Sequence, residues 1–538
     1  MPEGGYAPLA LPRPDTPHRL TLLARRFHDA TAHSPHSVRT SGHTLEWDIK
    51  PFPFKVYTDL SPLALPRAFD PVAADTLAAL DPARRLSARP LDLERLAALL
   101  YLTAGVTRKK TYPGGGEVLF RAAASTGALY QTEVYVAAGD VEGLEPGLYH
   151  FGPGDFALRQ LRAGDVRAVL AEAAADETLA RRAAVVILSA IYWRNTWKYQ
   201  ARGYRHLFWD SGTMLANLLA AGDALGAAPR LVAGFVDAAV NRLLGLDVDR
   251  EAALELVALG HEALLDTGGT PGWSLDDLPE IGYEILPLSS EEVDYPELRA
   301  MHQASRLDSP VEVAAWHGRL APALRQPRGT LTPLPPPRAE AGRGLGETIQ
   351  RRGSSRQFSH APISALELST VLWWATRPIE RDVPGGLVDL YLVLNAVDGL
   401  PAGAVRYWPE PHALEFLSEG EYRSRSGYLC LEQALGADAA AVIYFLSPLA
   451  DILAAYGDRG YRLVNLEAGL IGGRAYLAAY GQGFGASGLT FYDADVVRFF
   501  SPSARGHDAV FVTALGRSAG AAAQGVEVTG LQVTPRTR

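Results

Sequence analysis

The spacing of apolar and polar positions along this chain predicts one series of elements twice. Each series begins with apolar residues at helical spacing and continues with a strand-like alternation that a glycine-containing turn interrupts. A long Ala/Leu-rich helical run follows, and a short apolar strand ending in Leu-Gly closes the series. Each copy is therefore expected to read helix, hairpin, long helix, strand. The segments are 91–104, 129–151, 214–227 and 254–260 in the first copy, and 363–376, 387–408, 470–486 and 510–516 in the second.

A direct sequence repeat supports this duplication. Residues 199–212 read YQARGYRHLFWDSG, and residues 456–469 read YGDRGYRLVNLEAG. The shared RGYR blocks begin 257 positions apart (459 − 202), and Asp210 and Glu467 keep that spacing. Further along, Gly226 and Gly485 stand where helix C-termini are expected. So long a period indicates two duplicated domains and not a solenoid, whose repeats run about 20–50 residues.

The expected fold class is α+β, with two domains in tandem. We expect the domains at 81–265 and 341–520, joined by an acidic and Pro-rich linker over 266–340. Residues 1–80 show no clear periodicity and are expected to pack as an irregular extension over the first domain. Residues 521–538 are expected to be a C-terminal tail.

Composition narrows the classes of function. The 538 residues are 48% hydrophobic and 21% charged, and the net charge of −9 argues against a nucleic-acid or anionic-membrane binder. The single cysteine, Cys430, excludes a disulfide framework, a thiolate zinc site and an iron–sulfur cluster. His33, His36 and His43 lack a ligand spacing, so no metal is expected. No targeting segment or membrane-spanning stretch stands out, and a cytoplasmic protein is expected.

The second copy opens with a candidate phosphate clamp. Residues 351–356 read Arg351-Arg352-Gly353-Ser354-Ser355-Arg356. Guanidinium groups suit phosphate oxygens, and serine hydroxyls add hydrogen bonds. The first copy has only a looser counterpart, ARRLSARP, over 83–90. The alternative interpretation of such a run is a solvated helix start.

Small residues in the first copy form a second candidate element. The run Ser125-Thr126-Gly127-Ala128 follows three alanines, and residues this small let backbone N–H groups approach a flat ligand closely. The second copy has lost these hydroxyls over 382–387. A packed turn without a ligand is the alternative.

A Lys–Tyr pair occurs in one copy alone. Lys198 and Tyr199 precede the first RGYR block, whereas the second copy has alanine at 455 beside Tyr456. A lysine can act as a general base if burial or neighbouring cations lower its pKa, and Arg194 and Arg202 are candidates for those cations. The alternative is a surface lysine beside a core tyrosine.

Together these segments resemble a known family. The chain resembles tandem members of the FMN-dependent nitroreductase superfamily, specifically the SagB-type dehydrogenases, also called thiazoline or oxazoline oxidases (McbC-like). Four segments carry the resemblance: HSPHSVRTSGHTLEWDIKPFPFKVYTDLSPLALP at 33–66, AAASTGALYQTEVYV at 122–136, WKYQARGYR at 197–205 and RRGSSRQF at 351–358.

The resemblance implies an intramolecular pseudo-dimer with one FMN at the interface between the domains. The second copy would supply the phosphate motif at 351–356, and the first would supply Ser125 to Ala128, with Lys198 as the base and Tyr199 as its partner. Leu489, Thr490 and Arg517 match further positions that the superfamily uses against the flavin. The other composite site would combine ARRLSARP, VPGGLVDL and AAY, all degenerate, so one working FMN per chain is expected.

The family's reaction is the two-electron oxidation of an azoline in a peptide to an azole, with hydride transfer to the flavin. Three alternatives stay open: an NAD(P)H-dependent nitro or quinone reductase, a non-catalytic flavin-binding scaffold subunit of a peptide-modifying complex, and a flavin-free relic of the fold. The substrate is expected to be a small molecule or a modified peptide, and the protein a monomer (pseudo-dimer) or a homo-oligomer.

Overall fold

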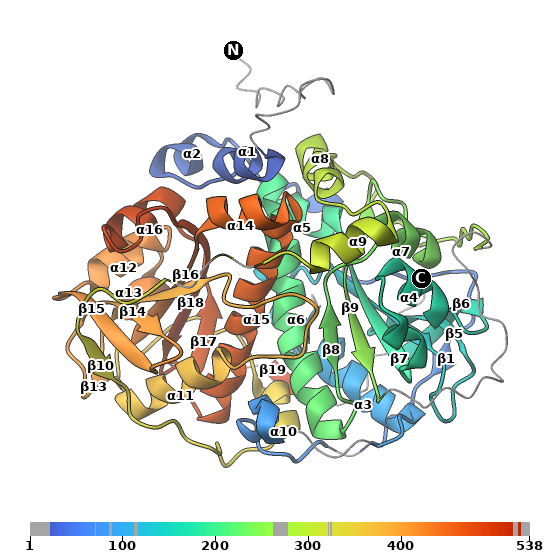
Figure 1. The fold of residues 1–538 in the computed structure, drawn as a ribbon, viewed down its shortest axis with the longest axis horizontal. Coiled ribbons are helices and arrows are strands. Elements are labelled where there is room, and N and C mark those ends of the chain that lie inside the picture. Colours follow the sequence, from blue (N-terminus) through green and yellow to red (C-terminus); the bar gives the residue numbers. More distant parts are fainter. Residues whose placement is uncertain are drawn as a thin grey trace.

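Two similar halves pack against each other through a pair of long helices. The structure is a computed structural model that describes residues 22–69, 71–84, 89–111, 117–261, 278–320, 322, 325–519 and 526–528. Each half contains a seven-stranded antiparallel sheet, and the helices α6 (Gly203–Leu225) and α15 (Arg459–Gly481) stand side by side between the sheets (Figure 1). The mixed helix-and-sheet architecture in two tandem domains is the predicted one.

The two sheets have the same strand order. The first is β1-β6-β5-β4-β7-β9-β8, and the second is β10-β15-β14-β12-β16-β18-β17, so every strand has a counterpart in the other half. The first sheet comprises β1 (Leu63–Ala64), β4 (Thr132–Ala138), β5 (Gly147–Gly152), β6 (Ala157–Ala163), β7 (Ala184–Ile191), β8 (Arg230–Val232) and β9 (Glu251–Leu259). The second comprises β10 (Leu331–Pro333), β12 (Asp389–Leu394), β14 (Gly403–Trp408), β15 (Ala413–Glu419), β16 (Ala441–Ser447), β17 (Gly485–Gly488) and β18 (Asp508–Gly516).

Shorter strands and helices complete the fold. A small sheet contains β2 (Val106–Thr111), β3 (Glu117–Arg121) and β19 (Val526–Val528), and β11 (Ile363–Ser364) pairs with β13 (Val397–Asp398). The remaining helices of the first half are α3 (Leu93–Ala104), α4 (Arg167–Ala173), α5 (Tyr192–Tyr199) and α7 (Asp237–Leu244). Those of the second half are α10 (Leu345–Arg351), α11 (Ala365–Ala375), α12 (Arg423–Leu429), α13 (Ala434–Asp438), α14 (Leu449–Tyr456) and α16 (Asp493–Phe500).

The predicted series of elements is confirmed in both copies. Helix α3 begins at Asp92, whose side chain accepts a hydrogen bond from the Arg95 amide, and α11 begins at a capping box of Ser364 and Glu367. The expected helix end at Gly485 is wrong, because α15 ends at Gly481 and Gly485 opens β17. The left-handed glycine after α15 is Gly483, the counterpart of Gly226 after α6.

Two glycines let the long helices approach closely. A Cβ atom on Gly212 would lie 2.6 Å from the Leu466 carbonyl oxygen and 2.6 Å from the Leu470 amide nitrogen. Gly469, its repeat counterpart, faces the Trp209 backbone in the same way. No side chain fits in this space, so the repeated glycine marks the axis of the helix pair.

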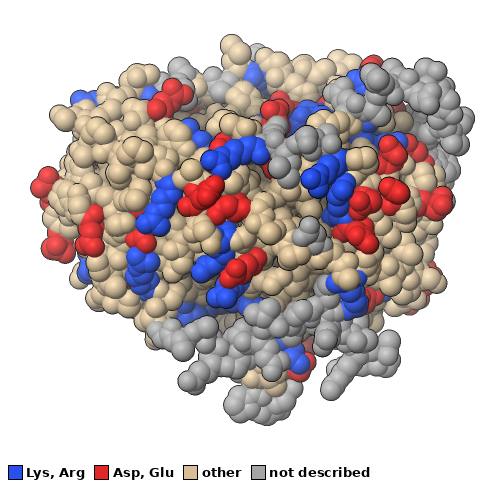
Figure 2. Space-filling model, turned by 90° about the horizontal axis from the view of Figure 1, so that it is seen from below, with Lys and Arg blue, Asp and Glu red and all other residues tan. Residues whose placement is uncertain are grey.

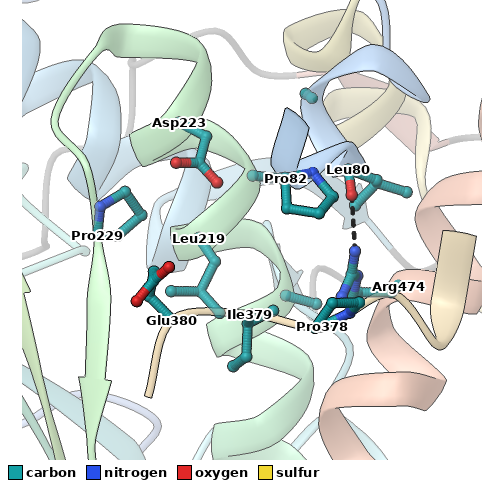
Figure 3. Close-up of a pocket in the computed structure, with 12 residues that line it drawn as sticks. Leu80, Pro82, Leu219, Asp223, Pro229, Pro378, Ile379, Glu380 and Arg474 are labelled. Carbon is teal, nitrogen blue, oxygen red and sulfur yellow. Dashed lines mark hydrogen bonds between the residues drawn. The ribbon is translucent and has the colours of Figure 1, made fainter. Parts of the chain in front are cut away.

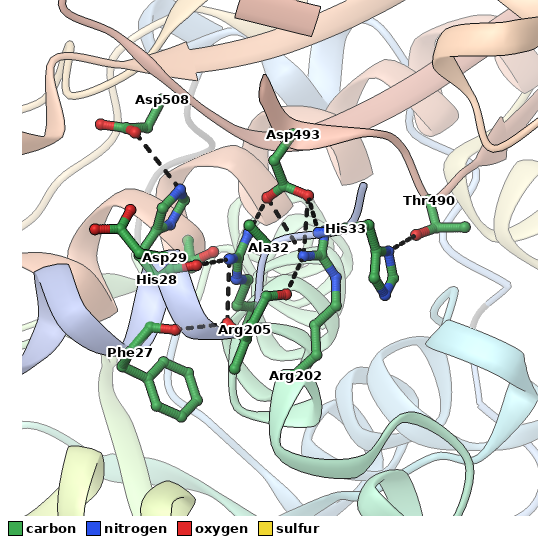
Figure 4. Close-up of polar contacts among 12 residues, drawn as sticks. Phe27, His28, Asp29, Ala32, His33, Arg202, Arg205, Thr490, Asp493 and Asp508 are labelled. Atoms are coloured by element: carbon green, nitrogen blue, oxygen red, sulfur yellow. Dashed lines mark hydrogen bonds and ion pairs between the residues drawn. The ribbon is translucent and has the colours of Figure 1, made fainter. Parts of the chain in front are cut away.

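The RGYR blocks form a reciprocal clamp between the halves. Asp493 of the second half accepts a 2.6 Å hydrogen bond from Arg205 and lies 3.1 Å from Arg202 (Figure 4). Asp237 of the first half accepts hydrogen bonds of 2.6 Å from both Arg459 and Arg462. All of these side chains are buried.

The N-terminal extension is more regular than predicted. Helices α1 (Leu23–Ala30) and α2 (Pro35–Thr40) lie over the second half, where His33 N–H donates to Asp493 at 2.8 Å. The following segment covers the first half, because Lys55 forms a 2.6 Å ion pair with Glu251. The expectation of irregular structure over the first domain alone is therefore wrong for the described part.

The predicted linker is also partly folded. Helices α8 (Pro296–Ala304) and α9 (Pro310–His317) lie within it, and Ser305 between them accepts a 2.7 Å hydrogen bond from Arg462. Strand β10 pairs with β15 of the second sheet. The acidic and Pro-rich composition of this segment did not indicate helices or strands. The residues that stabilise these elements, such as Arg462 and β15, are distant in the sequence. Residues 262–277 lie outside the described part.

Two surface properties bear on partners. On the face seen from below, basic and acidic side chains are interspersed (Figure 2). Across the described residues, no helix combines the length and the apolar character that a membrane crossing requires.

Candidate functional site

The candidate phosphate motif reaches from the second half into the first. Arg352 follows α10, is 4% exposed, and donates from Nε to the Ala122 carbonyl at 2.9 Å. Its Nη2 donates to the Arg121 carbonyl at 3.0 Å. The motif thus contacts the backbone that leads into the small-residue run, as the composite site requires.

A third guanidinium, which the sequence analysis did not single out, joins this motif. Arg108 on β2 lies beside Gly353, since a Cβ atom there would be 2.8 Å from Arg108 Nη1. Its Nε is buried without a hydrogen-bond partner. Burial lowers the pKa of Arg108, and the nearby Arg352 and Arg356 lower it further.

These three arginines form a cluster without a counter-ion among the described residues: Arg108, Arg352 and Arg356 form no ion pair with a described carboxylate. Cations gathered this closely repel one another, and an anion between them relieves the repulsion. The orphaned Arg108 Nε offers a donor to such an anion. The arrangement therefore fits a phosphate group.

Lys198 and Tyr199 lie at the end of α5, near enough to Arg356 for its charge to act on both. Burial lowers the pKa of Lys198, and the positive charges of Arg356 and Lys50 lower it further. Burial raises the pKa of Tyr199, Asp210 adds to the rise, and Arg356 opposes it. The pair therefore combines a lysine that gives up its proton more readily with a tyrosine that keeps its own.

The cations beside Lys198 are not the predicted ones. Arg194 pairs with Glu133 and donates to the Tyr130 carbonyl, and Arg202 pairs with Asp493. Both guanidinium groups are therefore committed to the packing of the fold. The positive charges that lower the pKa of Lys198 come instead from Lys50 of the N-terminal extension and Arg356 of the second half.

The run 125–128 is organised by Asp210 of α6. Ser125 and Thr126 donate their hydroxyl hydrogens to the Asp210 carboxylate at 2.6 and 2.7 Å. Gly127 adopts a positive φ of 65°, and a Cβ atom there would lie 2.9 Å from the Tyr199 hydroxyl oxygen. The loop and the Lys–Tyr pair are thus in contact, but the two hydroxyl hydrogens are already used within the protein.

The other predicted residues have varied surroundings. Arg351 points away from the cluster, because it pairs with Glu347 at 2.8 Å and its side chain is 62% exposed. Ser354 lies 3.2 Å from the Tyr476 hydroxyl. The remaining three are Leu489, which is buried, Thr490, which lies 3.2 Å from His33 Nδ1, and Arg517, which pairs with Glu367 at 2.7 Å.

In the part of the second composite site that the structure describes, the Arg381 guanidinium occupies the space beside Gly385. Arg474 donates a 2.7 Å hydrogen bond to the Leu80 carbonyl and lines a small pocket with Asp223 and Glu380 (Figure 3). Nearby, Asp382 accepts hydrogen bonds of 2.9 and 2.8 Å from the amides of Ala233 and Gly234, the repeat counterparts of Leu489 and Thr490. Residues 85–88 of ARRLSARP lie outside the described part.

Arg108, Asp237 and Asp493 escaped the sequence analysis. Arg108 lies on a strand outside the repeat, so no internal comparison marked it. Asp237 and Asp493 occupy matching positions 256 apart (493 − 237), which a longer alignment of the repeat would have revealed. Among the described residues, no group of three or more His, Cys, Asp or Glu side chains could hold a metal ion.

Comparison with known proteins gives a consistent result. The sequence profile of the Nitroreductase family matches residues 83–261 and 349–517. The chain is 28% identical over 161 residues to "Putative nitroreductase MJ1384" of Methanocaldococcus jannaschii, which covers 28% of this chain and 81% of that protein. It is 27% identical over 145 residues to the microcin B17-processing protein McbC of Escherichia coli, which covers 26% of this chain and 49% of McbC.

One solved structure matches nearly the whole chain. A protein of Anabaena variabilis, described as a putative nitroreductase, superposes with a TM-score of 0.75 at 27% identity, covering 93% of this chain and 100% of that one. The fold of both halves together is therefore found elsewhere, and the match to McbC confirms the resemblance drawn from the sequence motifs. These matches indicate an oxidoreductase. Because the family profile matches both halves in tandem, the chain belongs to the nitroreductase family.

Proposed function

We propose that this protein is an FMN-dependent oxidoreductase with one working cofactor site, built from both halves. The observation that carries the proposal is the cluster of Arg108, Arg352 and Arg356, which has no counter-ion among the described residues and adjoins Lys198 and Tyr199. FMN has an anionic phosphate at one end and a redox-active ring at the other. The arginine cluster suits the phosphate, and the Lys198–Tyr199 pair, which can hold or move a proton, suits the ring.

Each residue then has a chemical role. Arg108 and Arg352 hold the phosphate, and Ser354 adds a hydroxyl. Bound FMN supplies a two-electron acceptor. Lys198 takes a proton from the substrate, because its lowered pKa leaves more of it neutral near pH 7. Tyr199 stays protonated and donates a hydrogen bond.

The proposed substrate is an azoline ring in a modified peptide, which would be oxidised to an azole. The similarity to the microcin B17-processing protein McbC supports this substrate class and a role in a peptide-modifying complex. The chain spans about half the length of McbC, so substrate and partners are carried over as proposals. A reductase of nitro compounds or quinones that uses NAD(P)H is the second candidate, which the similarity to MJ1384 supports.

Flavin content is the direct test of the cofactor. The purified protein should show a flavin absorption spectrum with one FMN per chain. Arg108→Gln should raise the Kd for FMN about 10- to 100-fold, the effect of losing one charged hydrogen-bond donor to a phosphate. Lys109→Gln is the matched control: it removes the same charge from the next residue of β2, which pairs with Glu117. Protein that binds no FMN, or two per chain, would contradict the proposal.

Anaerobic mixing separates the two candidate reactions. For the oxidase, NADPH should leave the flavin oxidised, whereas an azoline-containing peptide should bleach it. Rapid bleaching by NADPH with no response to the peptide would favour the reductase.

A further inference from the structure

We propose that Asp210 is the positioning residue of the cofactor loop 125–131, through the hydrogen bonds that its ionised carboxylate accepts from that loop. This inference rests on the proposed function, since it assigns a task within the same site. Asp210 lies in the first half of α6 and is 5% exposed. The sequence repeat marked the position, but not its partners.

Four donors converge on this single carboxylate. The Ser125 hydroxyl, the Thr126 amide and the Gln131 side-chain amide donate to Oδ2 at 2.6, 2.8 and 2.7 Å. The Thr126 hydroxyl donates to Oδ1 at 2.7 Å. Both ends of the loop are therefore fastened to one residue of the central helix. A buried carboxylate with this many donors is satisfied without a cation, and it forms no ion pair with a described residue.

The loop needs such a fastening because its backbone is strained. Ala128 and Tyr130 have positive φ angles of 54° and 51°, a region that residues other than glycine rarely adopt. Between them and Asp210, Ser125 acts as a relay: its hydroxyl oxygen accepts the Tyr130 amide at 2.9 Å while its hydrogen goes to Asp210. Loss of the carboxylate would release both ends and let the strained turn relax.

The second half contains a natural comparison at the same repeat position. Glu467 accepts a 2.7 Å hydrogen bond from the Leu387 amide, but it also forms a 2.7 Å ion pair with Arg381. The Arg381 guanidinium fills the space beside Gly385, where a Cβ atom would collide with it. A carboxylate thus holds the loop in both halves. Among the described residues, Glu467 has a cation partner, Arg381, whereas Asp210 has none. In the first half, the space beside the loop is occupied by Tyr199.

Asp210 is charged at neutral pH, and its charge adds to the rise in the pKa of Tyr199 that burial causes. Burial raises the pKa of Asp210 to about 6, and its hydrogen bonds oppose the rise, so it is ionised at neutral pH. The titratable groups around it are Tyr199 from α5 and His206 from α6, whose ring lies 4.5 Å from the Tyr199 ring, with Arg356 of the second half facing Tyr199. Burial lowers the pKa of His206 well below its usual value, so this ring adds no charge.

Two substitutions separate the positioning role from the charge. Asp210→Ala removes the acceptor oxygens of all four hydrogen bonds, so amide hydrogen exchange of peptide 122–131 should accelerate at least 10-fold in the FMN-free protein, and the Kd for FMN should rise at least 10-fold. Asp210→Asn keeps the shape: its oxygen can accept the three donors on one side, and its amide can donate to the Thr126 hydroxyl oxygen. It should leave exchange within 3-fold of wild type. Glu467→Gln, the control at the matching position, should change neither exchange nor FMN affinity at the first site.

The pH dependence tests the charge. Wild-type FMN affinity should weaken below about pH 6, as Asp210 takes up a proton and loses an acceptor, and Asp210→Asn should abolish this change. Unchanged exchange in Asp210→Ala would overturn the positioning role, and an acid limb that persists in Asp210→Asn would overturn the role of the charge. If the wild type binds no FMN, the proposed function fails. The exchange measurement still decides whether Asp210 holds the loop.

Discussion

Replacing Asp237 by asparagine should destabilise the association of the two halves more than any surface substitution. Asp237 is the first half's contribution to the reciprocal clamp, and it accepts hydrogen bonds of 2.6 Å from both Arg459 and Arg462. Asparagine has the same shape, so it keeps the acceptor for the Leu307 amide, but it leaves two buried guanidinium groups without their counter-ion.

The size of the effect can be worked out in two ways. Burial alone would raise the pKa of Asp237, but Arg459 and Arg462 outweigh it and lower the pKa to about 2, from 3.8. That difference corresponds to about 2–3 kcal/mol of stabilisation of the charged form. Breaking a buried ion pair by removing one partner costs about 3–5 kcal/mol. We therefore expect the free energy of unfolding to fall by about 3–5 kcal/mol.

Urea denaturation at pH 7 measures this loss, because urea does not screen charges. Asp308→Asn is the control: Asp308 pairs with Arg306 at 2.7 Å, but its side chain is 61% exposed, so a change of about 0–1 kcal/mol is expected. The pKa of Asp237 is depressed, so its contribution is present above about pH 4 and lost as the pH falls toward 2. A loss below 1 kcal/mol, equal to that of the control, would refute the reasoning.

Three further substitutions test the site and the helix pair. Arg356→Gln removes a positive charge that lowers the pKa of Lys198, so the rising limb of the pH profile of kcat/KM should move up by ~0.5 to 1 pH unit, and an unchanged profile would contradict this. Lys198→Ala should lower kcat about 100-fold or more while FMN absorbance stays the same, and a retained turnover would leave the lysine without a catalytic role. Gly212→Ala should lower the free energy of unfolding by ~1 to 3 kcal/mol, because its Cβ would lie 2.6 Å from the Leu466 carbonyl; Gly318→Ala, with no neighbour closer than 3.6 Å, is the control that should not change it.

Sequence patterns revealed less where an apolar run shows no alternation of apolar and polar residues. The alternation of the β4–β5 hairpin was visible because turn residues and polar positions interrupt it. Strand β7 was not recognised, since all its residues are buried and its apolar run has no period of two. The short helices α1 and α2 were missed because their stabilising contacts, such as that of His33 with Asp493, join residues far apart in the chain.

In the candidate site, too, sequence patterns identified the residue types but not their contacts. The motif 351–356, the loop 125–128 and the Lys198–Tyr199 pair were found as residue types in a pattern. That Arg352 contacts the backbone leading into this loop, and that Arg356 lies near Lys198, depend on how the two halves meet. Arg351 instead pairs with Glu347 of its own helix. The sequence did not predict that the hydroxyls of Ser125 and Thr126 donate to Asp210, because this pairing depends on the position of the loop relative to α6.

By itself, the sequence determined the duplication, the order of helix, hairpin, long helix and strand in each copy, and the segregation of the chemically capable residues between the copies. These properties follow from local periodicity and from the internal repeat, which can be recognised without knowledge of contacts. Only the tertiary structure decided that Arg108 belongs to the cluster, that the RGYR blocks clamp the halves through Asp237 and Asp493, and that the Arg381 guanidinium occupies the space beside Gly385. The physical reason is that hydrogen bonds, ion pairs and steric exclusion act over a few ångströms, between residues that the chain separates by hundreds of positions.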